Sequence, residues 1–127
     1  MVQLRKLKKQ RLIFYKSLQP IYSPALKEKI YFTSEGFKHL IYESSGSPRV
    51  SAEQYLKLMY LKYVPDVIQE CRAVSKIRVD KSNGIKWFEL IHKAKGFGPV
   101  RVVVKRMVSG KFVFVSVMPH GRSKKRR

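Results

Sequence analysis

Three histidines and two basic residues in a valine-rich segment are the side chains best suited to chemistry on a phosphate ester. The histidines are His39, His92 and His120, and Arg101 and Lys105 lie four residues apart in the second half of the 127-residue chain. A histidine can move a proton near neutral pH, and an arginine or lysine can stabilise negative charge on a phosphate oxygen. These residue types together could cleave RNA through its own 2′-hydroxyl.

The remaining reactive residue types do not form a recognisable metal or cofactor site. The eight acidic residues are scattered without a paired-carboxylate motif, and the histidines do not have the spacing of metal ligands. Cys71 is the only cysteine, so it can form neither an intramolecular disulfide nor a thiolate cluster. A glycine-rich phosphate-binding loop is also absent. We therefore expect neither a metal ion nor a cofactor.

The charge of the chain predicts an anionic partner. Lys and Arg total 28 against 8 Asp and Glu, which gives a formal net charge of +20. Phosphate backbones are the commonest partners of such proteins, so nucleic acid is the favoured partner. The basic residues are enriched at both ends of the chain, where we expect them to hold nucleic acid. The residues assigned this role are Arg5, Lys8, Lys9, Lys124 and Lys125.

A membrane partner is not expected from the sequence. No apolar stretch is long enough to span a bilayer, and the start of the chain lacks the pattern of a signal peptide. The sequence therefore predicts a cytoplasmic protein.

Helices are expected in the first half of the chain. Leucines among basic residues predict an amphipathic helix over residues 2–16, and a short extended segment over 29–32 precedes a helix capped by Thr33 or Ser34. Ser51 and Gln54 read as a capping box that opens the next helix, and Pro65 suits the first turn of another. The apolar stripe expected on the helix after Ser51 consists of Leu56, Met59, Tyr60 and Tyr63.

Strands are expected in the second half. From Ser75 onward β-branched and aromatic residues dominate, and turn signals at 82–84, 96–99 and 109–110 divide them into four segments. The predicted fold is α+β, with N-terminal helices packed on one face of a C-terminal four-stranded antiparallel sheet. The expected organisation is a basic helical arm and loop over 1–28, one domain over 29–119, and a basic tail over 120–127.

The last hairpin predicts how the sheet presents its side chains. A two-residue turn at Ser109-Gly110 would pair Lys105 with Phe114 and Val103 with Ser116. Strand alternation then gives a valine face for the helices to cover and a second face that carries the charged residues. Arg101 and Lys105 have no carboxylate on these two strands, so the second face is expected to be a basic cleft. The residues of this second face are Arg101, Val103, Lys105, Met107, Phe112, Phe114 and Ser116.

Two roles are open for Phe112 and Phe114. They could stack on the bases of a single-stranded nucleic acid, or the N-terminal arm could fold over both of them. His39 lies nearly opposite the apolar stripe of its helix, so it either faces solvent or reaches the cleft. His120 follows the last strand closely and is a second candidate for the acid.

Several local motifs in this order of elements are suggestive of a known group of proteins. They are Tyr31-Phe32-Thr33, Gly36-Phe37-Lys38-His39-Leu40, Trp87-Phe88-Glu89-Leu90, Lys95-Gly96 and Phe114-Val115-Ser116-Val117. Over residues 29–119 the chain resembles the superfamily of small ribonucleases and toxins that includes barnase, EndoU, the tRNA-cutting colicins and RelE. Its local texture is most similar to the phage and mobile-element members of that group.

The resemblance implies metal-independent cleavage of RNA. In that superfamily a histidine of the helical half, an arginine on an inner strand and a Ser or Thr on the last strand do the chemistry, which here implies His39, Arg101 and Ser116. It also implies an acidic antitoxin protein that covers the basic cleft, and some members act on the ribosome.

Two functions from different classes are consistent with the sequence. The first is a toxin-type endoribonuclease that acts on RNA, such as tRNA or ribosome-associated mRNA. The second is a non-enzymatic RNA- or DNA-binding protein of a mobile element, or a ribosome-associated factor, in which the same face only holds nucleic acid. A third class, a scaffold for an acidic protein, would lack affinity for nucleic acid at physiological salt.

Overall fold

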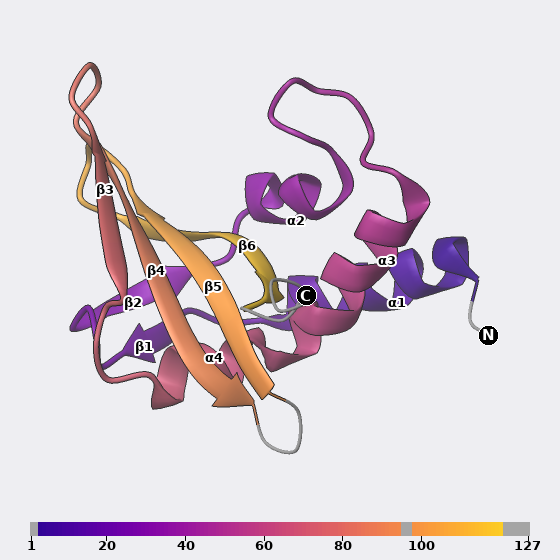
Figure 1. The fold of residues 1–127 in the computed structure, drawn as a ribbon, viewed down its shortest axis with the longest axis horizontal. Helices are drawn as coiled ribbons and strands as arrows, with labels where there is room; N and C mark the ends of the chain where they lie inside the picture. The colour runs from indigo at the N-terminus through magenta and orange to yellow at the C-terminus, as the bar shows by residue number, and fades with distance from the viewer. Residues whose placement is uncertain (1–2, 95–97, 121–127) are drawn as a thin grey trace, which may run out of the picture.

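The computed structural model describes residues 3–94 and 98–120 as helices and strands in an α+β arrangement (Figure 1), which confirms the predicted fold class. Four α-helices and a short 3-10 helix precede or separate the strands. The helices are α1 Leu4–Ser17, α2 Ser34–Ile41, α3 Ser51–Tyr60, the 3-10 helix η1 Leu61–Tyr63 and α4 Val64–Glu70. The strands are β1 Ile21–Ser23, β2 Glu28–Tyr31, β3 Lys76–Asp80, β4 Ile85–Ala94, β5 Gly98–Arg106 and β6 Phe112–Pro119.

The sheet is larger than the sequence predicted. Strands β3 to β6 form the expected antiparallel meander, but β1 and β2 extend it to six strands in the order β1-β2-β6-β5-β4-β3. The expected extended segment is β2, which runs parallel to β6 and pairs Ile30 with Phe112. Ile30 is fully buried, so the segment is part of the core. The β1-β2 hairpin thereby covers the start of the β6 edge.

The register of the last hairpin differs from the prediction at one point. Val103 pairs with Ser116 as expected, but Val104 pairs with Phe114 and Lys105 with Val113 because a β-bulge lies between these pairs. The connection is also longer than a two-residue turn, since the Met107 N–H donates to the Lys111 carbonyl at 2.8 Å. One extra residue in β6 reverses the inward and outward alternation on one side of the bulge.

The bulge places Phe112 and Phe114 on the face opposite Arg101. Phe112 is 8 % exposed and Phe114 is 1 % exposed, so the prediction that they floor a nucleic-acid cleft is wrong. Phe114 packs against Tyr15 of α1 with ring centroids 6.0 Å apart, so the N-terminal helix does fold over this residue. Phe112 packs instead against Phe88 at 5.6 Å.

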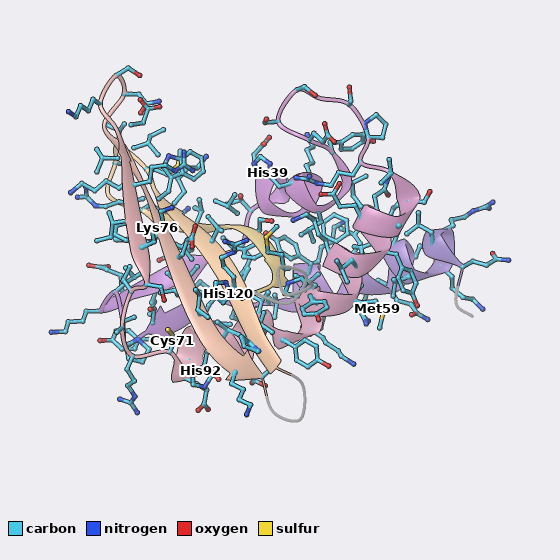
Figure 2. All side chains as sticks on the ribbon, viewed as in Figure 1. His39, Met59, Cys71, Lys76, His92 and His120 are labelled. Carbon is cyan, nitrogen blue, oxygen red and sulfur yellow. The ribbon has the colours of Figure 1, made fainter. Side chains whose placement is uncertain are left out.

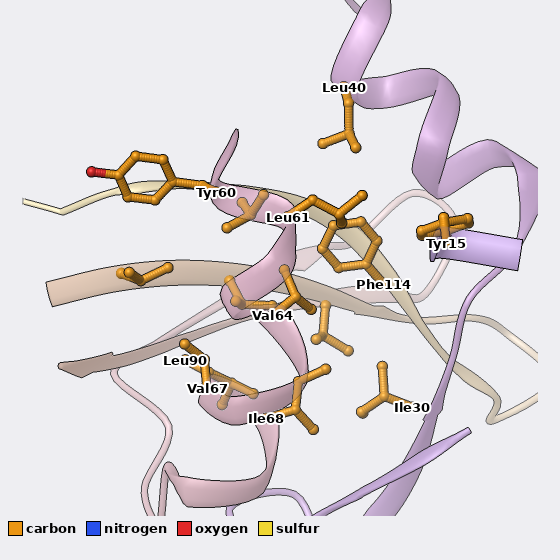
Figure 3. Close-up of a cluster of buried hydrophobic side chains, with 14 of the residues drawn as sticks. Tyr15, Ile30, Leu40, Tyr60, Leu61, Val64, Val67, Ile68, Leu90 and Phe114 are labelled. Atoms are coloured by element: carbon orange, nitrogen blue, oxygen red, sulfur yellow. The ribbon is translucent and has the colours of Figure 1, made fainter. Parts of the chain in front are cut away.

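The core lies between the sheet and the helices, and α4 covers part of it. The core face of the sheet carries Phe88, Leu90, Val100, Val102, Val104, Phe112, Phe114 and Val117. Val64, Val67 and Ile68 of α4 are fully buried in the same cluster, which Figure 3 shows beside Leu90 and Ile30. Pro65 lies in the first turn of α4 as predicted.

Helices α1, α2 and α3 also contribute buried residues to this core. α2 and α3 pack along β6, beyond the point where β2 leaves it, and α1 packs on α3 (Figure 1). The Arg11 Nε donates to the Leu58 carbonyl at 2.9 Å, and Leu7 is buried, which fixes α1 to α3. The helices therefore border the opposite face of the sheet as well as covering the core.

The buried side of α3 is also displaced from the expected stripe. Leu56 is 41 % exposed, and the buried residues are Gln54, Lys57, Leu58 and Tyr60. The expected capping box does not form, because Val50 is the N-cap and the Gln54 amide donates to the Arg49 carbonyl at 2.7 Å. This rotation buries Lys57 against the sheet and leaves Leu56 exposed.

No helix within residues 3–94 and 98–120 is long and apolar enough to cross a membrane.

Candidate functional site

The face of the sheet opposite the core, here called the outer face, has three cross-strand rows and carries the predicted site residues Arg101, Lys105 and Ser116. The first row joins Ile91, Arg101 and Met118. The second row joins Lys76, Glu89, Val103 and Ser116, and the third joins Arg78, Trp87, Lys105 and Val113. Arg101, Ser116 and Lys105 thus share one face, as predicted, and the rows are about 7 Å apart.

Lys57 of α3 reaches this face as a buried amine. The residue is 2 % exposed, and its Nζ donates to the Ser116 Oγ at 3.0 Å and to the Val117 carbonyl at 3.4 Å. Neither acceptor carries a full negative charge. Burial, followed by the nearby charges of Arg49 and Arg101 against the opposing charge of Glu53, lowers the pKa of Lys57 to about 8. Lys57 can therefore exchange a proton close to neutral pH.

Arg101 lies in the row next to Ser116 and is partly exposed. Its Nη1 is 3.7 Å from the Glu89 Oε1, so the expectation that no carboxylate pairs with Arg101 is corrected by a neighbour on β4. Its Nη2 contacts the Met118 Sδ, and its Nε is buried without a hydrogen-bond partner among the described residues. A buried, unsatisfied N–H is costly, and a phosphate oxygen would satisfy it.

His39 of α2 is half-buried on the side of its helix that borders the outer face. Burial lowers the pKa of His39, Glu35 opposes this, and the charges of Lys105, Arg49 and Lys57 lower it further. His39 is therefore a neutral base at pH 7 that lies within electrostatic reach of Lys57 and Lys105. A hollow of about 480 Å³ adjoins it, between α2 and the loop that follows, and is lined by Glu35, Lys38, His39, Tyr42, Glu43, Ser44 and Gly46.

Of the other two histidines, His120 lies at the Arg101 end of the outer face and His92 lies apart from it. His120 is half-buried just after β6. Its backbone N–H donates to the Pro99 carbonyl at 3.1 Å, one row beyond Arg101. Figure 2 shows His39 and His120 well apart. His92 pairs with Val100 and lines a separate hollow with Asp66 and Glu70 of α4, so it does not join the site.

The predicted basic residues of the N-terminal helix do not lie on the outer face. Arg5 and Lys9 are exposed and Lys8 is half-buried on α1, which extends away from the sheet beside α3 (Figure 1). Lys124 and Lys125 lie outside the described residues.

Lys57 is the residue that sequence reasoning missed. The signal was present: Gln54, Lys57, Leu58 and Leu61 follow the i, i+3, i+4, i+7 spacing of a buried helix face. The prediction of a more apolar stripe through Leu56 placed Lys57 on the solvent-exposed side of the helix. A lysine inside a helical stripe of buried residues is the pattern that identifies such a group.

No group of three or more His, Cys, Asp and Glu side chains in the described part of the chain is placed to hold a metal ion. Comparisons with protein-family models, curated proteins and solved structures find no match to this chain.

Proposed function

We propose that this protein is an endoribonuclease that cleaves RNA without a metal ion, using the 2′-hydroxyl of the substrate as nucleophile. The observation that carries the proposal is a chain of interactions that links four groups from four elements. They are the neutral His39 of α2, the buried amine of Lys57 on α3, the guanidinium of Arg101 on β5 and the hydroxyl of Ser116 on β6. A base, an acid and cations for a phosphate are the parts that this reaction needs.

The roles follow from the protonation states. His39, neutral at pH 7, takes the proton from the 2′-hydroxyl as its oxygen attacks phosphorus. Lys57, whose pKa is about 8, is largely protonated at pH 7 and gives its proton to the leaving 5′-oxygen. The P–O5′ bond breaks, and the products are a 2′,3′-cyclic phosphate and a free 5′-hydroxyl. Ser116 positions the Lys57 amine through the 3.0 Å hydrogen bond.

The electrostatics favour an anion at this point. Lys57 is buried near Arg49 and Arg101, and both of these charges lower its pKa. A bound phosphate would offset that repulsion and would also accept a hydrogen bond from the unsatisfied Arg101 Nε. In the transition state, where the phosphate gains charge, both interactions strengthen.

The test is cleavage of total RNA and of translating ribosomes in the presence of EDTA. We expect discrete fragments that end in a cyclic phosphate, and a loss of about 100- to 1,000-fold in rate for Arg101→Ala. Arg72→Ala, which removes the same charge from an exposed position, is the matched control and should cleave normally.

A non-enzymatic nucleic-acid-binding protein is the second candidate, and the net charge of +20 favours it. In that case the RNA stays intact in both mixtures, while salt-sensitive binding persists and weakens with each phosphate contact removed.

A further inference from the structure

The third row of the outer face combines two cations with the only tryptophan of the chain. Arg78, Trp87 and Lys105 lie directly opposite one another on β3, β4 and β5. The Arg78 Cζ is 4.9 Å and the Lys105 Nζ is 5.2 Å from the centroid of the Trp87 ring. Trp87 is half-buried and Arg78 is exposed, so the row is open to solvent.

The two cations of this row keep their charge available. The ion pairs of the described residues are Arg49 with Glu53 and Arg101 with Glu89, so neither Arg78 nor Lys105 belongs to one. Asp80, further along β3, accepts hydrogen bonds from the Ser82 backbone at 3.0 Å and hydroxyl at 2.7 Å, and its carboxylate also interacts electrostatically with Arg78 without forming an ion pair within the described residues. An indole ring holds a cation in place without neutralising it. The row is therefore preorganised to receive an anion.

The row is continuous with the proposed site. Lys105 lies close enough to His39 to lower the pKa of that histidine, and the first and third rows are about 13 Å apart along β5. Basic side chains and an aromatic ring along one surface are features by which proteins hold single-stranded nucleic acid, whose phosphates follow one another along the strand.

We propose that Arg78, Trp87 and Lys105 form a second subsite, which binds a phosphate of a flanking nucleotide in the single-stranded RNA that is cleaved between His39, Lys57 and Arg101. This inference rests on the proposed function. It makes the substrate an extended single strand, with the outer face holding several nucleotides at once.

Trp87 itself reports on the subsite. A 2′-O-methyl RNA decamer cannot be cleaved through its 2′-oxygen, so its binding to the wild-type chain can be followed by the fluorescence of this single tryptophan. We expect a saturable change in emission. Arg78→Gln and Lys105→Gln should each reduce the slope of log affinity against log salt by about 0.7. Lys86→Gln is the matched control, because Lys86 adjoins Trp87 in sequence but is exposed on the opposite side of β4.

Cleavage kinetics provide the second readout. Arg78→Gln should raise KM for an RNA decamer about tenfold and leave kcat unchanged, and it should not alter cleavage of a dinucleotide, which is too short to reach the third row. Emission that does not change on binding, or equal effects of Arg78→Gln and Lys86→Gln, would overturn the subsite.

The two proposals fail separately. If the decamer changes the Trp87 emission of the wild-type protein but the protein cleaves no RNA, the subsite stands and the ribonuclease does not. If RNA is cleaved while Arg78→Gln leaves decamer KM and emission unchanged, the ribonuclease stands and the subsite does not. A response of Trp87 to duplex RNA or an acidic peptide, and none to the single strand, would also overturn the assignment.

Discussion

Replacing Lys57 by methionine is expected to make the protein more stable and inactive. The substitution keeps an unbranched side chain of similar length and removes the charge of a residue that is 2 % exposed. Within the described residues, the side-chain hydrogen-bond partner of the Lys57 amine is the neutral hydroxyl of Ser116, at 3.0 Å. The charged form is therefore less stable in the folded chain than in water.

The pKa of Lys57 gives the size of the effect. Folding lowers this pKa from 10.5 to about 8. Since one pKa unit corresponds to about 1.4 kcal/mol, the charged amine costs about 3 kcal/mol at pH 7. Methionine removes that cost but loses the hydrogen bonds to Ser116 and Val117, at about 1 kcal/mol each. We expect the free energy of unfolding to rise by about 1 to 2 kcal/mol at pH 7.

The same shift predicts a pH signature. Between pH 8 and pH 10.5 the unfolded chain holds a proton on Lys57 that the folded chain has released, so wild-type stability rises with pH in this window. Between pH 7 and pH 9.5 the wild type should gain about 2 kcal/mol relative to Lys57→Met. Taking the difference between the two proteins cancels the contribution of every group that they share.

The assay is urea denaturation of the wild type, Lys57→Met and Lys16→Met across this pH range, with RNA cleavage measured alongside. Lys16 is exposed on α1, so its substitution should change neither stability nor its pH dependence appreciably. A Lys57→Met protein that is less stable than wild type at pH 7, with a difference that stays constant to pH 9.5, would refute the view that Lys57 is a strained, charged group.

Three further predictions concern the pH optimum and the core. As pH increases, kcat/KM should rise below pH 6.5 because His39 loses its proton, and it should fall near pH 8 because Lys57 loses its proton. Rate assays across this pH range test the profile, and His39→Ala should abolish its acidic limb. Phe114→Ala should lower the free energy of unfolding by about 3 to 5 kcal/mol, because the residue is 1 % exposed, and a loss below 1 kcal/mol in urea denaturation would contradict its core position. Gly36→Ala should lower the free energy of unfolding by about 1 to 3 kcal/mol in the same assay, since a β-carbon there would meet the Tyr15 hydroxyl and lie 2.8 Å from the Phe114 carbonyl oxygen. Unchanged stability would show that α2 can move away.

The sequence by itself determined the class of fold and the residue types of the candidate site. Leucine spacing, the proline at 65 and the turn signals at 82–84 and 109–110 predict helices followed by an antiparallel meander, and α1, α4 and β3 to β6 agree with them. Strand alternation placed Arg101, Lys105 and Ser116 on one face. These are properties of local spacing, which the chain expresses wherever the element finally packs.

The tertiary structure decided the residues that depend on register and on rotation of a helix. A single extra residue in β6 moved Phe112 and Phe114 from the outer face into the core. The way α3 packs on β6 brought Lys57, instead of Leu56, to Ser116. Glu89 and Trp87 lie on the outer face because β4 pairs with β5, which places them opposite Val103 and Lys105.

The physical reason is that these choices are made by non-local contacts of similar energy. Two neighbouring stripes of α3 are both partly apolar, and a bulge costs one unpaired residue in return for burying two aromatic side chains. The balance between such alternatives depends on what covers each face, and here that includes α1, whose Tyr15 packs on Phe114.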